Sequence, residues 1–156
     1  MAEVRWLTDK ESRAWQAYIT AAHLVERAVA HQLRMGAALS HGDYALLHML
    51  SVAPGKGMRM GEIAELQAAS KSRISYQVDQ LVARGLVRRE PHPEDARGLV
   101  AVLTEEGERL LEETAPGHVQ TVREHFVDLL DEDQLESLEK ICTHLAKQLR
   151  AKPRRN

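Results

Sequence analysis

Residues 70–80 carry side chains suited to binding an anionic, hydrogen-bonding partner rather than to making or breaking bonds. Hydroxyl, amide and basic groups alternate there with apolar residues at three- and four-residue steps. On a helix, Ile74, Val78 and Leu81 fall on one side and the polar groups fall elsewhere. Such a helix can be anchored by its apolar side while its polar side contacts phosphates and base edges in a DNA major groove, which is about 12 Å wide.

Arg73 has the most specific chemistry on this polar face. Its guanidinium can donate two hydrogen bonds to a guanine or bind a phosphate, and the hydroxyls of Ser70, Ser72 and Ser75 can bond either partner. The backbone N–H groups at a helix N-terminus add further donors. The same pattern also fits a solvated face on any small helical protein. The segment that follows the helix is therefore needed to distinguish a DNA-binding face from a solvated one. The candidate DNA-binding residues are Ser70, Lys71, Ser72, Arg73, Ser75, Tyr76, Gln77, Gln80, Arg88 and Arg97.

The hydrophobic period changes after this helix. Gly85 stands where a helix C-cap glycine belongs. Residues 86–89 are short and partly β-branched, the prolines and glycine of residues 91–98 indicate a loop, and residues 99–103 predict a strand. Two strands around a loop that carries Arg97 make a β-hairpin, or wing. A helix, a tight turn, a helix and then this wing predict a winged helix-turn-helix.

The remaining elements must position this unit. A long helix is predicted over residues 8–35, a second helix over 41–53 after the N-cap Ser40, and a short one over 61–67, with a loop at 54–57. Another helix begins after Thr104, and the Pro116-Gly117 pair is expected to kink or interrupt it.

The two ends of the chain carry long apolar faces. Trp15 and Ile19 share one face of the first helix. The last helix begins at the N-cap Asp131 and shows an apolar step of 3, 4, 3 and 4 residues, which is a heptad seam typical of helices that pack along their length. The candidate dimerisation residues are therefore Trp15, Ile19, Leu135, Leu138, Cys142, Leu145 and Leu149.

Within residues 63–107 the sequence resembles the MarR-type regulators, with the segments in that family's order and spacing. The resemblance implies a mainly α fold, namely a winged helix-turn-helix with N- and C-terminal dimerisation helices and a two- to three-stranded β-wing. In a single chain domain 1–156, it implies dimerisation helices at 1–38 and 118–150 and a DNA-binding lobe at 40–116. The segments that carry it are Ser70-Lys71-Ser72-Arg73-Ile74-Ser75, Val78-Asp79-Gln80-Leu81, Arg84-Gly85-Leu86-Val87-Arg88-Arg89, Asp95-Ala96-Arg97-Gly98 and Leu103-Thr104-Glu105-Glu106-Gly107.

The resemblance also implies a function. A transcriptional regulator, a repressor rather than an activator, would bind a pseudo-palindromic operator in double-stranded DNA as an obligate homodimer. Each recognition helix would contact one half-site and each wing a flanking minor groove. Arg97 matches the family's wing arginine, and Asp95 matches the acidic residue that orients the wing; Gly98 departs from the side chain that many members carry. A small aromatic or phenolic effector is implied as a further partner.

Composition limits the other classes of function. The net charge is −2, so any positive field must be local, and residues 56–97 hold eight basic against six acidic residues. The sequence shows no glycine-rich phosphate loop, no GxSxG and no HExxH, so neither an enzyme nor a cofactor is expected. Its apolar runs are too short to cross a membrane and its N-terminus lacks a signal-peptide core, which makes a cytoplasmic location the expectation.

A metal- or redox-responsive sensor of the same fold is the alternative. His118 and His125 are seven residues apart, as are His41 and His48, but no pair with metal-ligand spacing stands out, and zinc needs about four converging ligands. No metal site is therefore expected. Cys142, the single cysteine, lies in the heptad seam and is expected to be buried and unreactive.

Overall fold

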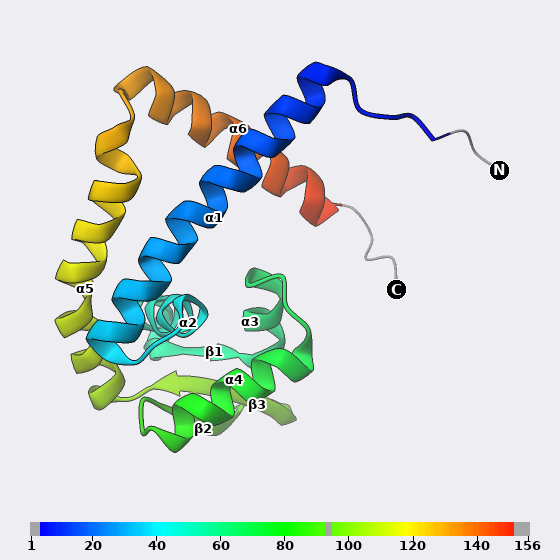
Figure 1. Ribbon diagram of the computed structural model, residues 1–156. Coiled ribbons are helices and arrows are strands. Elements are labelled where there is room, and N and C mark those ends of the chain that lie inside the picture. The colour runs from blue at the N-terminus through cyan, green and yellow to red at the C-terminus, as the bar shows by residue number, and fades with distance from the viewer. Residues whose placement is uncertain (1–3, 93–94, 152–156) are drawn as a thin grey trace.

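The protein consists of a small mixed lobe, two long helices that extend from it, and a third long helix that begins at the far end of the second (Figure 1). The computed structural model describes residues 4–92 and 95–151, and only the backbone of Ala96 and Arg97. This mainly helical order with a small sheet confirms the predicted winged helix-turn-helix. The elements in chain order are α1 (Asp9–Ala37), α2 (His41–Val52), η1 (Pro54–Lys56), β1 (Gly57–Arg59), α3 (Met60–Leu66), α4 (Lys71–Ala83), β2 (Val87–His92), β3 (Asp95–Leu103), α5 (Glu105–His125), η2 (Val127–Leu129) and α6 (Glu132–Ala151).

Side-chain caps fix where the helices begin. The hydroxyl of Ser40 accepts the backbone N–H of Asp43, whose carboxylate accepts the N–H of Ser40, and Thr8 does the same for α1. Asp131 and Gln134 form the same reciprocal pair before α6. These pairs satisfy N–H groups that have no partner inside the helix. The N-caps predicted at Ser40 and Asp131 are confirmed.

The antiparallel sheet has the strand order β1-β3-β2, and its strands are longer than predicted. β1 lies partly inside the 54–57 loop of the prediction and pairs with β3. The loop predicted over 91–98 is wrong at both ends, because Pro91 pairs with Leu99 and His92 with Asp95. A proline is tolerated there because β2 is an edge strand, where a missing N–H donor can face away from the ladder.

The sequence predicts a kink or an interruption at Pro116-Gly117, and the interruption is wrong. α5 continues to His125, and the chain leaves the helix at Phe126, with φ −145° and ψ −66°. A proline inside a helix removes one backbone hydrogen bond and costs roughly 3 kcal/mol, and packing of α5 against α1 offsets this. The two helices approach closely, since a Cβ on Gly117 would lie 2.9 Å from the Nε2 atom of Gln32.

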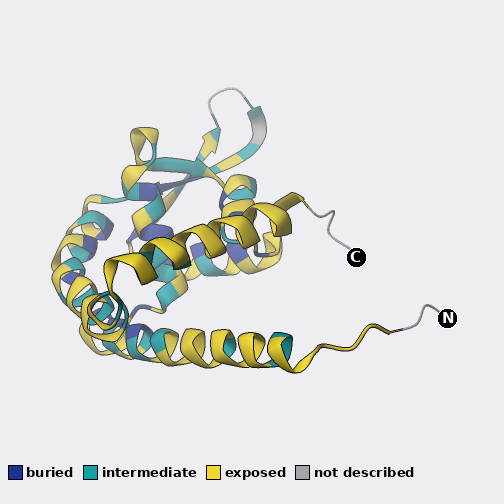
Figure 2. Ribbon diagram, turned by 90° about the horizontal axis from the view of Figure 1, so that it is seen from above, coloured by how far each residue is buried: buried dark blue, intermediate teal, exposed yellow. Residues whose placement is uncertain are grey.

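The hydrophobic core lies in the lobe, where the inner end of α1 meets α2, α3, α4 and the sheet. Away from the lobe, α6 has no buried residue and most of α1 is exposed, as the yellow ribbon in Figure 2 shows. Among the described residues, α6 and the outer part of α1 therefore keep exposed apolar side chains that no other element buries. The fully buried large side chains of the core include Leu33, Leu39, Leu46, Leu47, Leu50, Ile63, Ile74, Leu81, Val78 and Val87.

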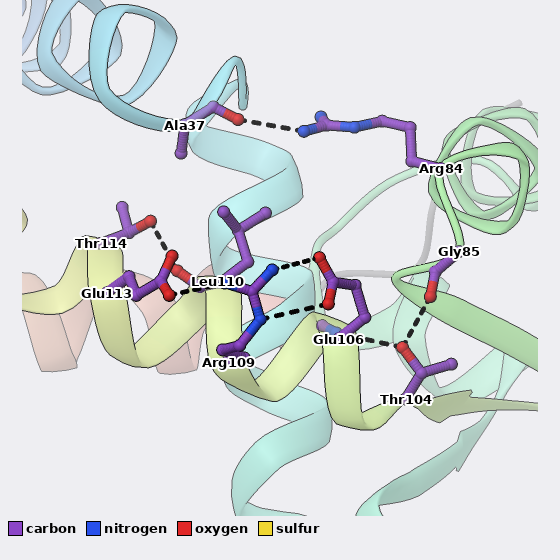
Figure 3. A network of polar contacts seen from close by, with 10 residues as sticks. Ala37, Arg84, Gly85, Thr104, Glu106, Arg109, Leu110, Glu113 and Thr114 are labelled. Carbon is purple, nitrogen blue, oxygen red and sulfur yellow. Dashed lines mark hydrogen bonds and ion pairs between the residues drawn. The ribbon is translucent and has the colours of Figure 1, made fainter.

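A tight corner joins the end of α4 to the start of α5. Gly85 has φ 73°, and its carbonyl oxygen accepts the hydroxyl of Thr104 at 2.7 Å (Figure 3). The same hydroxyl accepts the backbone N–H of Gly107 at 3.0 Å. A Cβ on Gly107 would lie 2.2 Å from the carbonyl oxygen of Leu86, which is far inside contact distance. The backbone of α5 can therefore approach this corner only with glycine at position 107.

We predict that Gly107→Ala lowers the free energy of unfolding by about 1–3 kcal/mol, the usual cost of overpacking a closed site. Gly61→Ala is the matched control, because a Cβ on Gly61 meets nothing within 4 Å. An alanine in that helix should stabilise the protein by about 0.5–1 kcal/mol. Urea unfolding followed by circular dichroism measures both changes. Equal effects of the two substitutions would contradict the close approach.

Candidate nucleic-acid interface

The helix α4 presents a polar N-terminal end on an apolar anchor. Ile74, Val78 and Leu81 are each at most 1% exposed and face the core. The Ser70 hydroxyl caps the helix by accepting the backbone N–H of Arg73 at 3.2 Å. The predicted DNA-binding residues that are exposed on this helix and its cap are Ser70, Lys71, Ser72, Arg73, Tyr76 and Gln80.

Two of the predicted contacts, Ser75 and Gln77, are half-buried and hold α4 in place. The Nε2 atom of Gln77 donates to Oδ1 of Asp43 at 3.1 Å, which joins α4 to the capped start of α2. The Ser75 hydroxyl accepts Nη2 of Arg89 at 3.2 Å. Helical periodicity places both residues off the apolar stripe, but it cannot show that neighbouring elements cover them.

Arg89 is a structural residue that the sequence did not single out. Its Nη1 atom donates to Oδ1 of Asp79 at 2.6 Å, and its Nη2 atom donates to the carbonyl oxygen of Ser75 at 3.1 Å. The side chain is 27% exposed, so solvent screens this pair only partly. Arg89 therefore fastens the first wing strand to α4. Asp79 and Arg89 both lie in the segments that resemble the MarR-type regulators. That resemblance is the sequence signal that could have identified their ion pair.

Arg59 of β1 contacts both wing strands near the tip of the hairpin, where His92 pairs with Asp95. Arg88, a predicted DNA contact, lies in β2, where its Nε atom donates to Glu90 at 2.6 Å. Asp95, the predicted wing-orienting residue, has Oδ2 3.8 Å from Nη1 of Arg59, and Nη2 of Arg59 lies 3.2 Å from Nδ1 of His92. Arg59 in β1 thus joins both wing strands, and no short motif marks it in the sequence.

A side chain at position 98 would be crowded by residues of both wing strands. A Cβ there would lie 3.1 Å from Oδ2 of Asp95 and 3.1 Å from the Cβ atom of His92. At the departure noted at Gly98, any larger residue would therefore require these neighbours to move by a few tenths of an ångström. The backbone of Arg97 lies in β3, and its side chain lies outside the described residues.

The predicted dimerisation residues lie along α1 and α6. A groove of about 990 Å³ between these helices is lined by Leu135, Leu138, Cys142 and Leu145 of α6 together with apolar residues of α1. Ile19 is half-buried, Trp15 is 57% exposed and Leu149 is 65% exposed. Cys142 is exposed in the single chain, so the burial expected for it is wrong at this level. No described residue of α6 is buried, so the seam is exposed in the single chain.

A histidine pair lies where α1, α2 and α5 meet. The ring of His118 is 4.3 Å from that of Tyr44 and 6.1 Å from that of His41, whose Nδ1 lies 2.6 Å from Oε2 of Glu26. Burial lowers the pKa of His118, and the nearby His41 and His48 lower it further. Within residues 4–92 and 95–151, no three His, Cys, Asp or Glu side chains converge to hold a metal ion.

None of the described helices combines the length and the apolar character that a membrane crossing requires.

The fold and this interface define a winged helix-turn-helix protein, with α3 and α4 as the helix-turn-helix and β2 and β3 as the wing. A protein-family model described as MarR family matches residues 39–98. The chain is 42% identical to Sco3205, a MarR family transcriptional regulator from Streptomyces coelicolor solved in complex with DNA. That match covers 96% of this chain and 93% of Sco3205, with a TM-score of 0.91. The chain belongs to the MarR family of transcriptional regulators.

Two further relatives agree with this membership. AbsC, a MarR family transcriptional regulator from Streptomyces coelicolor, is 40% identical, with 96% of this chain and 100% of AbsC covered and a TM-score of 0.90. The HTH-type transcriptional repressor YetL from Bacillus subtilis is 33% identical over 96 residues. That last match spans 60% of this chain and 58% of YetL, less than two thirds of the relative.

We predict that the protein becomes less stable as the pH is lowered, because folding lowers the pKa of His118. The pKa of His118 is lowered by folding, so the unfolded state binds more protons below about pH 6.5, the ordinary pKa of histidine. The stabilisation is complete above that pH and is lost as the pH falls from there towards the folded pKa.

Unfolding by urea at about pH 7.5 and about pH 5.5 should show this loss, and His118→Gln should reduce it. His125→Gln, which changes an exposed histidine, is the control. An unchanged pH dependence in His118→Gln would rule this origin out.

Proposed function

We propose that the chain acts as a homodimeric repressor that binds a pseudo-palindromic operator in double-stranded DNA, with one α4 helix in the major groove of each half-site. The observation that carries this proposal is the pair of basic side chains on α4 that lack an acidic partner within the described part of the chain. Among the described residues, Lys71 and Arg73 make no ion pair, whereas Arg88 and Arg89 pair with Glu90 and Asp79. Exposed, unpaired cations at a helix N-terminus are the groups that bind phosphates and guanine edges.

The relatives support the DNA partner and the direction of regulation. Sco3205 has been solved in complex with DNA, and its match spans nearly the whole of both chains. YetL is named as a transcriptional repressor, and its match lies within a shorter part of the chain. Repression is therefore the proposed direction. Release by a small aromatic or phenolic effector stays a prediction from the family resemblance.

The proposed dimer explains the uncovered outer helices. The exposed apolar side chains of α6 include Ile141 at 57%, Leu145 at 47% and Leu149 at 65%. A continuous apolar surface of this kind indicates a protein interface. A second copy related by a two-fold axis would cover it and place two α4 helices on one side of the assembly. DNA-binding dimers of this kind contact half-sites about one helical turn apart.

We predict that Arg73→Ala changes the preferred sequence, and not only the affinity. If Arg73 contacts a guanine, its loss should cost about 1–3 kcal/mol at one base position of each half-site. Lys71→Ala is the matched control, because a lysine on a phosphate should weaken all sequences alike and reduce the salt dependence. Selection of bound duplexes from random DNA, followed by titration at several salt concentrations, measures both. If both variants bind the selected duplex as tightly as the wild type, α4 is not the contact.

We predict that Leu145→Glu separates the dimer. The new carboxylate would lie in the groove between α1 and α6, where burial without a partner is costly. Val52→Glu is the matched control, because Val52 is 71% exposed on the lobe and lies outside the α1–α6 groove. Sedimentation equilibrium should give a dimer for the wild type and the control and a monomer for Leu145→Glu. A monomeric wild type would contradict the proposed assembly.

A further inference from the structure

Arg84 connects the end of α4 to the end of α1. Its Nη1 atom donates to the carbonyl oxygen of Ala38 at 2.8 Å. Its Nη2 atom donates to the carbonyl oxygen of Ala37 at 3.0 Å, and Figure 3 shows this second contact. The last carbonyl groups of a helix have no donor inside the helix and carry partial negative charge. A planar guanidinium can bond two adjacent acceptors at once, whereas a lysine ammonium is a single point charge. The contact therefore constrains direction as well as distance.

Both ends that Arg84 joins are themselves fixed. At the end of α1, Ala38 has φ 51°, and the backbone N–H of Leu39 donates to the carbonyl oxygen of Leu33 at 3.2 Å. Leu39 is fully buried, which anchors the turn in the core. At the end of α4, Gly85 is held by the Thr104 hydroxyl. Arg84 thus lies between two rigid turns.

The apolar contacts of α4 fix how deeply the helix is buried in the lobe, but they restrict its angle to the neighbouring helices less strongly. Ile74, Val78 and Leu81 pack in the core, but hydrophobic burial is not directional. Polar contacts supply direction. Gln77 joins the middle of α4 to α2, and Asp79 joins α4 to the wing through Arg89. Arg84 adds the contact to α1, the helix whose outer part lies in the proposed dimer interface.

We propose that Arg84 is a positioning residue that fixes the angle of α4 relative to α1 and thereby sets the half-site spacing that the dimer accepts. This inference deepens the proposed function and rests on it. In a dimer held by α1 and α6, the separation and tilt of the two α4 helices depend on how each is tied to its own α1. Loss of that tie allows α4 to adjust to half-sites at other separations.

The test uses the full-length protein and three duplexes. One is the duplex selected by the wild type, and the others have one base pair removed from or added to its centre. The readout is the ratio of affinities for the selected and altered duplexes. Arg84→Gln should lower this ratio at least about five-fold, the lower end of typical coupling between sites. Arg84→Lys should lower it less, because one ammonium can still bond one carbonyl.

Arg109→Gln is the matched control. Arg109 is an exposed arginine that bonds Glu106 and Glu113 of its own helix α5, so its loss unties no other element. It should keep the wild-type ratio. Circular dichroism and sedimentation equilibrium, at the temperature of the binding assay, should show that every variant is folded and dimeric. A ratio that changes in a folded dimer reports α4 geometry, because a general loss of stability lowers all affinities alike.

The outcomes separate this inference from the function on which it rests. A wild type that selects one spacing, together with an Arg84→Gln variant that keeps the same ratio, overturns the role of Arg84 alone. An equal loss of affinity on all three duplexes overturns it too, because that pattern indicates a phosphate contact. A wild type that binds no duplex overturns the proposed function and this inference with it.

Discussion

The close approach of α5 to the end of α4 is the constraint on which the rest of the structure depends. The carbonyl oxygen of Leu86 lies so near Gly107 that no side chain fits between them. The Thr104 hydroxyl closes the same corner through Gly85. The wing begins directly after it, at Val87, and α5 leaves from it towards the outer helices. One corner therefore sets where the recognition helix ends, where the wing starts and how the lobe is attached.

The local positive charge of this protein comes from basic side chains that lack an acidic partner in the part of the chain that the structure describes, and not from an excess of basic residues. The net charge of −2 gives no general attraction to DNA. Arg59 pairs with Asp95 and joins β1 to the wing, and Arg89 pairs with Asp79 and joins the wing to α4. Arg88 pairs with Glu90 of its own strand β2. Lys71 and Arg73, for which the described residues provide no ion pair, stand at the exposed start of α4. A local positive field of this kind can act on a phosphate backbone within a Debye length of roughly 8–10 Å.

Local sequence signals were sufficient to predict most of the fold, because each depends on residues close in the chain. The N-caps at Ser40 and Asp131 and the apolar stripe of α4 are examples. The length of β2 and β3 and the continuity of α5 through Pro116 were not predictable this way. In both cases tertiary packing outweighs the local preference of proline, since an edge strand or a well-packed helix can tolerate its missing N–H.

The sequence predicted which side of α4 is exposed, but it did not predict the hydrogen bonds that the residues of the site make with other elements. Lys71, Arg73 and Gln80 are exposed, as the helical period indicated. Ser75 and Gln77 bond partners that are 14 and 34 residues away, and Arg84 bonds Ala37 and Ala38 across 47 and 46 residues. The helical periodicity of a sequence does not predict hydrogen bonds between residues so far apart. The apolar seam of α6 has the spacing that the sequence predicts, but no described residue of the chain buries it.

In the proposed complex, two α4 helices occupy successive major grooves on one side of a duplex. Missing-base interference on the selected duplex measures this arrangement, because each removed base reports its own contribution to binding. Two clusters of interfering bases are expected, centred about 10 base pairs apart, which is one helical turn of B-DNA. A single cluster, or interference that is uniform along the duplex, would contradict it.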